Sequence, residues 1–337
     1  MRAIGYQNSL PIDDPNALVD IELPKPAPTG RDILVEVRAI SVNPVDTKVR
    51  RGVKPEAGAW KVLGWDAAGT VVAVGSQVER FRVGDAVFYA GSIGRPGANS
   101  EFHLVDERIV GRKPASLDWA EAAALPLTSI TAWEMLFDRL DVRKPVPGAA
   151  PALLIVGGAG GVGSIAIQLA RRLTDLTVIA TASRPETREW AQGLGAHHVI
   201  DHSKPLAAEV AALGLGAPGV VFSTTNTHFA EIITLIAPQG RFGLIDNPAT
   251  VDIKPFKDKS VSVHWESMFT RSTFATPDMG AQGALLDEVS RLVDEGALRT
   301  TLAQTFGAIN AAGLRRAHAL IESGRAKGKI VLVGFEG

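Results

Sequence analysis

Glycines crowd one short stretch of the chain, where they could bind a phosphorylated cofactor. Residues 152–156 form an apolar run typical of a buried strand, and residues 165–173 have the pattern of a helix. Between them, Gly158, Gly160 and Gly163 match the spacing G-x-G-x-x-G. Such glycines let the backbone approach a pyrophosphate, which the N–H groups at the helix start then bind. The sequence therefore predicts a dinucleotide site, and the alternative is a tight strand–helix turn without a ligand.

The residues after the next predicted strand, residues 177–181, indicate which dinucleotide binds. A site specific for NAD usually has an acidic residue here, which holds the ribose hydroxyls. This chain has Ser183 and Arg184 instead, and Arg188 follows one helical turn later. A guanidinium binds a phosphate through two hydrogen bonds, so these residues favour the 2′-phosphate of NADP(H). If Arg184 is only a solvated charge, the cofactor preference stays open.

The residue types give little support to metal or thiol chemistry. The chain has 337 residues and no cysteine, which excludes a disulfide, a thiolate nucleophile and a cysteine-bound metal. Its seven histidines show no ligand spacing. His197 and His198 are adjacent on a predicted strand, so their side chains point to opposite faces. We therefore expect no metal site.

The overall composition is that of a globular protein with small-molecule partners. Hydrophobic residues make up 46% of the chain and charged residues 21%, which suffices for a sizeable core. A net charge of −1 argues against binding to nucleic acid or to a membrane surface. There is no run of eighteen apolar residues, and the first residues lack the apolar core of a signal peptide. These features predict a cytoplasmic protein.

The pattern of predicted elements changes twice along the chain. Residues 1–125 are rich in short strands, of which residues 32–41 alternate most clearly, and no long helical pattern interrupts them. Residues 126–260 alternate strands and helices, which predicts a doubly wound parallel sheet covered on both faces. In residues 261–337 this alternation is lost, although residues 261–265 still read as a strand. The fold class is α/β, with a barrel-like β domain before the parallel sheet.

Several motifs along the chain together resemble those of a known family. They are Ser-Val-Asn-Pro-Val-Asp at 41–46, Gly-Trp-Asp-Ala-Ala-Gly-Thr-Val at 64–71, Val-Gly-Asp-Ala-Val at 83–87, the segment 124–133, the glycine turn, and Gly-Lys-Ile-Val-Leu at 328–332. With these residues the chain resembles the medium-chain dehydrogenase/reductase superfamily. The resemblance covers nearly the whole chain and is strongest to the quinone oxidoreductase branch and to the set called zinc-type alcohol dehydrogenase-like.

The resemblance implies a domain arrangement and a chemistry. It implies a GroES-like β-barrel catalytic domain built from both chain ends, with an inserted Rossmann domain and a nicotinamide site in the cleft between them. It also implies a homodimer or a homotetramer. Zinc-dependent members carry a cysteine near residues 43–46 and a histidine where this chain has Trp65, an indole without a free lone pair. What remains is hydride transfer without a metal, to quinones or α,β-unsaturated carbonyls.

The resemblance also implies roles for individual residues on the cofactor side. It places Thr131 at the nicotinamide and Gly161 and Val162 under the pyrophosphate, with Ser183, Arg184 and Arg188 at the 2′-phosphate. It places His202 beside the adenosine. The remaining cofactor residues follow the fourth and fifth strands of the Rossmann domain, where ligands of such sheets bind: Ser223, Thr224, Ile245 and Asp246.

On the substrate side, the resemblance implies that Asn43 and Asp46 line the pocket, with Asn43 also reaching the cofactor. Asn43 could donate a hydrogen bond to a substrate carbonyl, or be a turn residue before a proline. Tyr89 could deliver a proton, or be a half-buried strand aromatic. Lys329 could brace the last strand or bind a cofactor phosphate.

The leading hypothesis is an NADPH-dependent reductase of quinones or α,β-unsaturated carbonyls. A second hypothesis is a dehydrogenase of simple alcohols or carbonyls that uses an unrecognised metal. A third is a non-catalytic NADPH-binding protein, because a fold alone does not determine a function.

Overall fold

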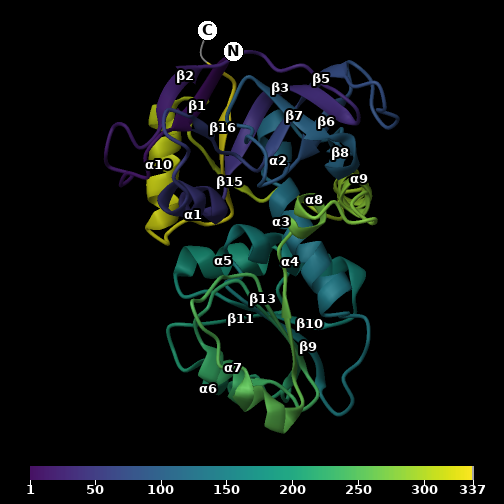
Figure 1. Ribbon diagram of the computed structural model, residues 1–337. Coiled ribbons are helices and arrows are strands. Elements are labelled where there is room, and N and C mark those ends of the chain that lie inside the picture. The colour runs from purple at the N-terminus through teal and green to yellow at the C-terminus, as the bar shows by residue number, and fades with distance from the viewer. Residues whose placement is uncertain (336–337) are drawn as a thin grey trace. The chain divides into compact units, whose positions relative to one another are not determined.

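The computed structural model describes residues 1–335, which divide into two compact units (Figure 1). Unit 1 contains Met1–Ile130 together with the chain from Phe269 onward, and unit 2 contains Thr131–Met268. Unit 2 is thus inserted between two separate parts of unit 1. The predicted α/β fold, a GroES-like domain with an inserted Rossmann domain, is confirmed.

Unit 1 is built on antiparallel β structure. Its larger sheet has the strand order β15-β16-β3-β5-β6-β8, with β7 paired to β3, and a smaller sheet has the order β2-β1-β4. The strands are β1 Arg2–Tyr6, β2 Val19–Glu22, β3 Asp32–Val42, β4 Lys61–Val62, β5 Ala67–Val74, β6 Ala86–Tyr89, β7 Phe102–Asp106, β8 Val110–Arg112, β15 Leu302–Thr305 and β16 Lys329–Val333. Strand β16 pairs antiparallel with β3, so the two ends of the chain share one sheet.

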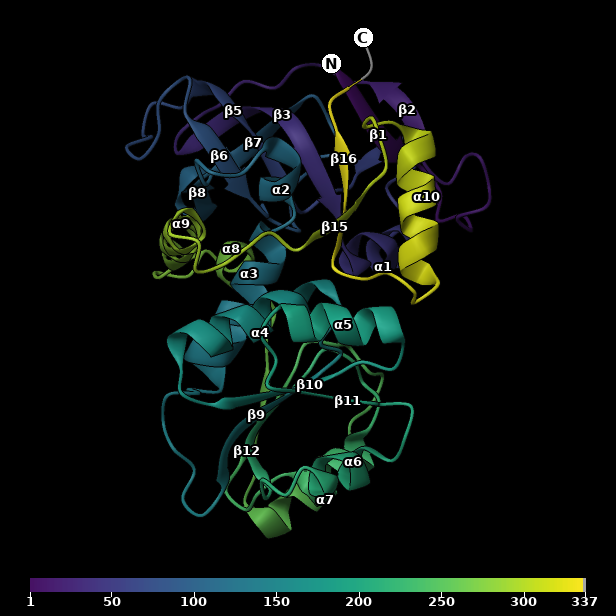
Figure 2. The same cartoon turned by 180° about the vertical axis from the view of Figure 1, so that it is seen from behind.

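The helices of unit 1 lie around these sheets. They are α1 Pro44–Gly52, the 3₁₀ turn Glu107–Ile109, α2 Trp119–Ala123, α3 Pro126–Trp133 (which continues into unit 2), α8 Thr270–Thr273, α9 Ala281–Asp294 and α10 Ala311–Glu322. Figure 2 shows α10 beside β16 and α1, and it contacts both. The sequence predicted no long helix in the first β domain, and it did not identify the short helix α1. This helix of nine residues is short and polar, and it is set by local capping rather than by an apolar stripe.

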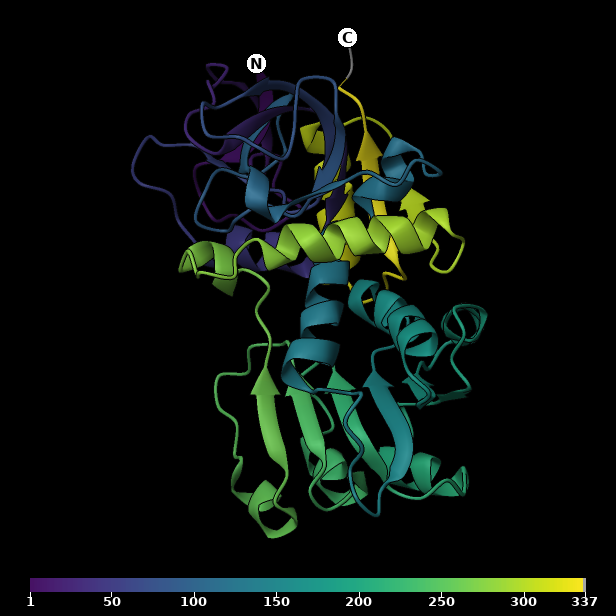
Figure 3. The same cartoon turned by 90° about the vertical axis from the view of Figure 1, so that its right-hand side faces the viewer.

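Unit 2 is a doubly wound parallel sheet (Figure 3). Its order, β11-β10-β9-β12-β13-β14, reverses direction between β9 and β12, where such sheets bind ligands. The strands are β9 Ala150–Val156, β10 Thr177–Thr181, β11 His198–Ile200, β12 Pro218–Ser223, β13 Arg241–Leu244 and β14 Ser262–Trp265. The helical segments are the π-helical turn Glu134–Arg139, α4 Gly161–Leu173, α5 Pro185–Gly193, α6 Leu206–Ala212, α7 Phe229–Leu235 and the 3₁₀ segment Lys254–Lys259.

One core of unit 2 lies between this sheet and the helices α6 and α7. Leu154, Ile179 and Phe242 from three strands pack there with Leu206 and Ile232 from the helices, and all five are buried. Burial of such a layer is the main favourable contribution to the folding of an α/β unit. The same sheet positions the loops at its carboxyl edge.

Strand β14 is the sixth strand of the parallel sheet and belongs to unit 2. The sequence grouped this segment with the return to the first domain, starting at residue 261. The domain boundary was misplaced because β14 lies at the edge of the sheet and its side chains are only partly buried. Its sequence therefore alternates like that of an antiparallel strand rather than forming a continuous apolar run. Within residues 1–335, every helix is too short or too polar to span a bilayer.

Candidate active site

The glycine turn in unit 2 has the geometry of a phosphate-binding loop. A Cβ atom at Gly163 would collide with the carbonyl oxygen of Gly157, and one at Gly158 would lie 2.8 Å from the Cβ of Ala180. These two glycines therefore allow the start of α4 to pack close to β9 and β10. At Gly160, by contrast, the nearest atom to an added Cβ is 3.6 Å away. The space in front of this exposed residue is open, as a cofactor pyrophosphate requires.

The first turn of α4 has N–H groups that could donate to such a pyrophosphate. Gly160 is the N-cap residue and has no side chain that could cap the helix. Gly161 and Val162 follow in the first turn and are half-buried. The first N–H groups of a helix have no partner within the helix and carry a partial positive charge. The residues present therefore fit a dinucleotide.

A threonine connects this turn to His202. The hydroxyl oxygen of Thr181, at the end of β10, accepts a hydrogen bond from the N–H of Gly157 at 3.0 Å and lies 2.9 Å from Nδ1 of His202. Burial, and then the neighbouring His228, lower the pKa of His202. The structure thus places His202 against the glycine turn as a half-buried, uncharged ring.

The two arginines after β10 have different surroundings. Arg188 donates to two backbone carbonyls, with Nη2 2.8 Å from Val199 O and Nη1 3.3 Å from Ala182 O. It therefore ties the ends of β10 and β11 together. Arg184 is the N-cap residue of α5, and its Nε lies 3.0 Å from Oε1 of Glu186. Ser183 is half-buried beside it. Of the two guanidinium groups, Arg184 is the one paired with an exposed side chain.

Ser223 and Thr224 follow β12 at the same carboxyl edge. The N–H and the hydroxyl of Thr224 both donate to Val156 O, at 3.1 and 2.9 Å. Ser223 is fully buried, and its hydroxyl donates to Thr225 O at 2.7 Å. Both side chains therefore shape the loop beside the glycine turn.

The remaining cofactor candidates of unit 2 lie after β13 and on α3. The N–H of Ile245 donates to Ser223 O at 3.3 Å. The Asp246 carboxylate accepts hydrogen bonds from the N–H groups of Asn226 and Asn247, at 3.2 and 2.9 Å. Thr131 is buried on α3. Ile245 and Asp246 are half-buried, so a ligand at this edge of the sheet can reach them.

In unit 1 a buried polar network surrounds Lys329. Its ammonium group, on β16, donates to Val42 O, to Oδ1 of Asn43 and to Oδ2 of Asp66, the last at 2.9 Å. Asp66 also accepts from the N–H of Leu127 at 2.7 Å. Lys329 and Asp66 are almost completely buried. Lys329 therefore neutralises a buried carboxylate.

Asn43 is held inside this network. Its Oδ1 accepts from Lys329, and its Nδ2 donates to Oδ2 of Asp66 at 2.8 Å. The same nitrogen also lies 3.4 Å from Trp65 O. The side chain is 1% exposed. The amide group is thus occupied by the protein, which favours a positioning role over direct donation to a substrate carbonyl.

Asp46 lies beside Asn43 in the first turn of α1. Its carboxylate accepts from the N–H of Asn43 at 2.8 Å and from the N–H of Gly64 at 3.0 Å. Burial raises the pKa of Asp46 to about 7, although the two N–H groups and Lys329 oppose the rise. Asp46 therefore joins α1 to the segment before β5.

Tyr89 is not part of the Lys329 network. It is fully buried, its hydroxyl is 3.1 Å from Nδ1 of His103, and Nε2 of His103 is 2.9 Å from Pro96 O. Because a carbonyl can only accept, Nε2 carries the proton and Tyr89 donates to Nδ1. Burial lowers the pKa of His103 to about 4, so the ring is neutral. This geometry gives Tyr89 a structural partner.

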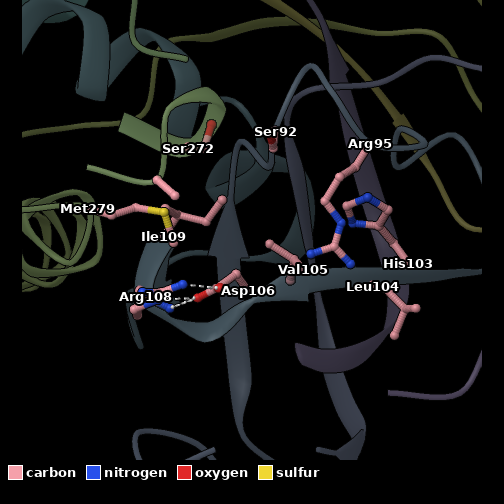
Figure 4. Close-up of a pocket in the computed structure, with 11 residues that line it drawn as sticks. Ser92, Arg95, His103, Leu104, Val105, Asp106, Arg108, Ile109, Ser272 and Met279 are labelled. Atoms are coloured by element: carbon pink, nitrogen blue, oxygen red, sulfur yellow. Dashed lines mark hydrogen bonds and ion pairs between the residues drawn. The ribbon is translucent and has the colours of Figure 1, made fainter. Parts of the chain in front are cut away.

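Unit 1 also contains a small pocket of about 170 Å³ (Figure 4). Its lining includes Arg95, Arg108 and His103, and none of the residues of the Lys329 network. Arg108 is paired with Asp106 at 2.8 Å, and Arg95 is paired with Asp32 at 2.8 Å. The pocket therefore lies apart from the Lys329 network, and its arginines are already neutralised.

The residues at the expected zinc positions do not fit a metal ion. Asn43 faces the ammonium group of Lys329, and the indole Nε1 of Trp65 donates to Ser92 O at 3.3 Å. Among residues 1–335, no three or more histidine, aspartate or glutamate side chains are grouped as a metal would need. The sequence did not assign a role to Asp66 or settle that of Lys329. The only features that could have pointed to them are an acid directly after Gly-Trp and a lysine in the last strand, and these two residues are 263 positions apart.

Together, a β unit with a buried polar network and a doubly wound sheet with a glycine turn define a two-domain nicotinamide-dependent oxidoreductase. Comparisons with known proteins agree. The chain matches the family model for the alcohol dehydrogenase GroES-like domain over residues 29–115 and the one for zinc-binding dehydrogenases over residues 194–332.

Relatives cover the full length of the chain. A zinc-type alcohol dehydrogenase-like protein of Staphylococcus aureus is 39% identical over 336 residues, which are 98% of this chain and 99% of that one. A crystal structure from Rhizobium etli, of a protein described as a zinc-dependent alcohol dehydrogenase, is 72% identical with a TM-score of 0.98 and covers 100% and 99% of the two chains. The quinone oxidoreductase of Escherichia coli, solved with NADPH, is 26% identical with a TM-score of 0.83 and covers 99% and 100%. The chain belongs to the medium-chain dehydrogenase/reductase family and is an oxidoreductase.

Proposed function

We propose that this protein is an NADPH-dependent reductase that transfers hydride to quinones or α,β-unsaturated carbonyls without a metal. The observation that carries the proposal is the Lys329 network in unit 1. By the family resemblance, Asn43 and Trp65 stand near the positions of the zinc ligands of zinc-dependent members, and the side chain of Asn43 faces the ammonium group of Lys329 instead. Without a metal, the substrate must stabilise its own negative charge. Quinones and conjugated carbonyls do so, because charge spreads over the conjugated system.

The proposed cofactor is NADP(H), bound by unit 2. Gly160 to Gly163 and the start of α4 would hold the pyrophosphate, Arg184 and Ser183 the 2′-phosphate, and His202 the adenosine side. The residues directly after β10, Ala182 to Arg184, do not include the acid that is usual in sites specific for NAD. The E. coli quinone oxidoreductase solved with NADPH supports the same choice.

When bound, the cofactor supplies the hydride, and the protein supplies orientation and a fixed electrostatic environment. In unit 1, Lys329 holds the amide of Asn43 in one orientation, and Asp46 anchors the start of α1. These residues act by positioning. Because the hydroxyl of Tyr89 already donates a hydrogen bond to His103, we assign the proton that completes reduction of a conjugated carbonyl to solvent.

Arg184→Ala tests the cofactor assignment. We expect the Kd for NADPH to rise about ten- to a hundred-fold, since hydrogen bonds to a charged group contribute about 1.5–3 kcal/mol. The Kd for NADH should change by less than about three-fold, as for an exposed ion pair. Fluorescence titration of both reduced cofactors measures this. Equal losses for both would contradict the 2′-phosphate role.

A substrate panel tests the reaction class. We expect turnover with NADPH and benzoquinones, naphthoquinones or enones, and no oxidation of simple alcohols with NADP⁺. Alcohol oxidation that a chelator abolishes would instead support the metal-dependent dehydrogenase. NADPH binding without turnover over the whole panel would support a non-catalytic binding protein.

The proposal includes a homodimer or homotetramer that works in the cytoplasm, on the strength of the family resemblance. Light scattering coupled to size-exclusion chromatography measures the number of chains, and fractionation of the source cells tests the location. A monomer would contradict the first expectation.

A further inference from the structure

An acidic side chain occupies the proposed 2′-phosphate site. Glu186 is in the first turn of α5, and its Oε1 lies 3.0 Å from Nε of Arg184, the N-cap residue. The Glu186 side chain is 57% exposed and that of Arg184 33% exposed, so both can rearrange when a ligand arrives. The acid is thus two residues away from the arginine that is expected to bind the phosphate.

We propose that Glu186 is a specificity residue that weakens the preference of this enzyme for NADPH over NADH by competing with the 2′-phosphate for Arg184. The inference rests on the proposed NADPH site. A phosphate must take over the guanidinium from Glu186 and then lies close to a carboxylate of the same sign. NADH has a 2′-hydroxyl there, which can donate to the carboxylate, as in sites built for NAD.

The neighbouring charges do not replace Arg184 in this competition. Arg188 uses its guanidinium to tie the carbonyls of Ala182 and Val199 together. His202 has a lowered pKa and is neutral near pH 7. Arg184 is therefore the cation whose partner decides the balance between the two cofactors.

Glu186 also has an ordinary structural explanation, which the experiment must separate. An acid in the first turn of a helix stabilises the helix by a few tenths of a kcal/mol through its dipole. Neutralising Glu186 therefore lowers the stability of α5 slightly, whatever it does to the cofactor. Glu189, exposed on the same helix, offers a matched control for the loss of one negative charge.

The experiment compares the native enzyme with Glu186→Gln and Glu189→Gln. We expect the ratio of kcat/KM for NADPH to that for NADH to rise about two- to five-fold in Glu186→Gln, the size typical of an exposed ion pair. The Kd for adenosine 2′,5′-bisphosphate, measured by calorimetry, should fall by a similar factor, and that for 5′-AMP should not. Glu189→Gln should leave both ratios unchanged. An unchanged or lower ratio in Glu186→Gln would overturn the inference.

Arg184→Ala distinguishes this inference from the proposed cofactor site. In the Arg184→Ala background, the change from Glu186 to Gln should alter the ratio by a smaller factor, because the competition for the cation is gone and only the direct effect of the carboxylate remains. If Arg184→Ala weakens the binding of NADPH alone but Glu186→Gln leaves the cofactor ratio unchanged, the proposed role of Glu186 is wrong and the 2′-phosphate site stands. If Arg184→Ala affects both cofactors equally, the 2′-phosphate site itself fails.

Discussion

Each unit of the molecule buries a carboxylate, and the two are stabilised in different ways. In unit 1, Asp66 receives three donors: Lys329 Nζ at 2.9 Å, Leu127 N at 2.7 Å and Asn43 Nδ2 at 2.8 Å. In unit 2, the Glu266 side chain is also fully buried, beside a second carboxyl, that of Glu134. Nε of Arg139 lies 2.7 Å from Oε2 of Glu266.

Their pKa values respond to these neighbours in opposite directions. Burial raises the pKa of both Asp66 and Glu266. Around Asp66 the ammonium of Lys329 is the largest opposing influence. Around Glu266 the Glu134 carboxyl adds to the rise, and the pKa reaches about 8 in spite of Arg139. The buried carboxylate of Asp66 is thus stabilised by the charge of Lys329, whereas the buried carboxyl of Glu266 is stabilised by being protonated.

The largest effect should come from removing that cation. Lys329→Met keeps the length of the side chain but leaves Asp66 buried without a positive partner. We expect the free energy of unfolding to fall by about 3–5 kcal/mol, the cost of breaking a buried ion pair from one side. Urea denaturation at pH 7 followed by circular dichroism measures it.

Two further variants give this result its meaning. The double variant Asp66→Asn/Lys329→Met removes both charges of the buried ion pair and should recover at least half of the lost stability. Lys54→Met, at an exposed position, should change stability by less than about 0.5 kcal/mol. A loss below about 1 kcal/mol in Lys329→Met would show that the buried ion pair is not needed.

Replacing Glu266 should have a smaller effect on stability, and this effect should depend on pH. Since the pKa of Glu266 in the folded protein lies near 8, above the value of 4.5 for a free glutamate, the folded state binds the extra proton. Its contribution to stability is full below about pH 4.5 and is lost as the pH rises through 8. Glu266→Gln resembles the protonated form at every pH.

We therefore expect the free energy of unfolding of the native protein to fall between pH 5.5 and 9 by on the order of 2 kcal/mol more than that of Glu266→Gln. Denaturation curves at several pH values measure the difference. Glu189→Gln, at an exposed site, should follow the native profile. Parallel profiles for the native protein and Glu266→Gln would mean that Glu266 stays ionised beside Arg139.

The two regions also differ in how far the sequence predicts them. The glycine turn could be predicted in detail, because Gly158, Gly160 and Gly163 lie within one strand–turn–helix unit whose spacing carries its geometry. The parallel sheet itself, though not the order of its strands, followed from the alternation of elements. Roles in cofactor binding stay predictions.

The Lys329 network could not be assembled in the same way. Lys329 reaches Asp66 only because β16 pairs with β3 across most of the chain, with Val331 opposite Ser41. A contact between residues so far apart in the sequence produces no local pattern from which it could be predicted. The helix α1 was missed for a similar reason, since Asn43 and Asp46 define its start through capping rather than through an apolar stripe.

Tyr89 and His103 form a third buried pair, in which both side chains are uncharged. The hydroxyl of Tyr89 donates to a ring that is neutral because burial lowers the pKa of His103 to about 4. Tyr89→Phe should therefore have the smallest effect, a loss of about 0.5–1.5 kcal/mol for one hydrogen bond. It should leave kcat with a quinone unchanged within about two-fold, since the group is not in the Lys329 network.

Stopped-flow reduction of a quinone and an enone by NADPH, alongside thermal unfolding, separates this structural role from the sequence-based prediction that Tyr89 delivers a proton. General acid catalysis typically contributes about 10²–10⁴-fold to a rate. A fall of that size in Tyr89→Phe, with the fold intact and the loss confined to the enone, would assign the proton to Tyr89. It would also require the hydroxyl to leave His103 during turnover. An unchanged rate together with lower stability would instead place Tyr89 among the buried pairs that hold unit 1 together.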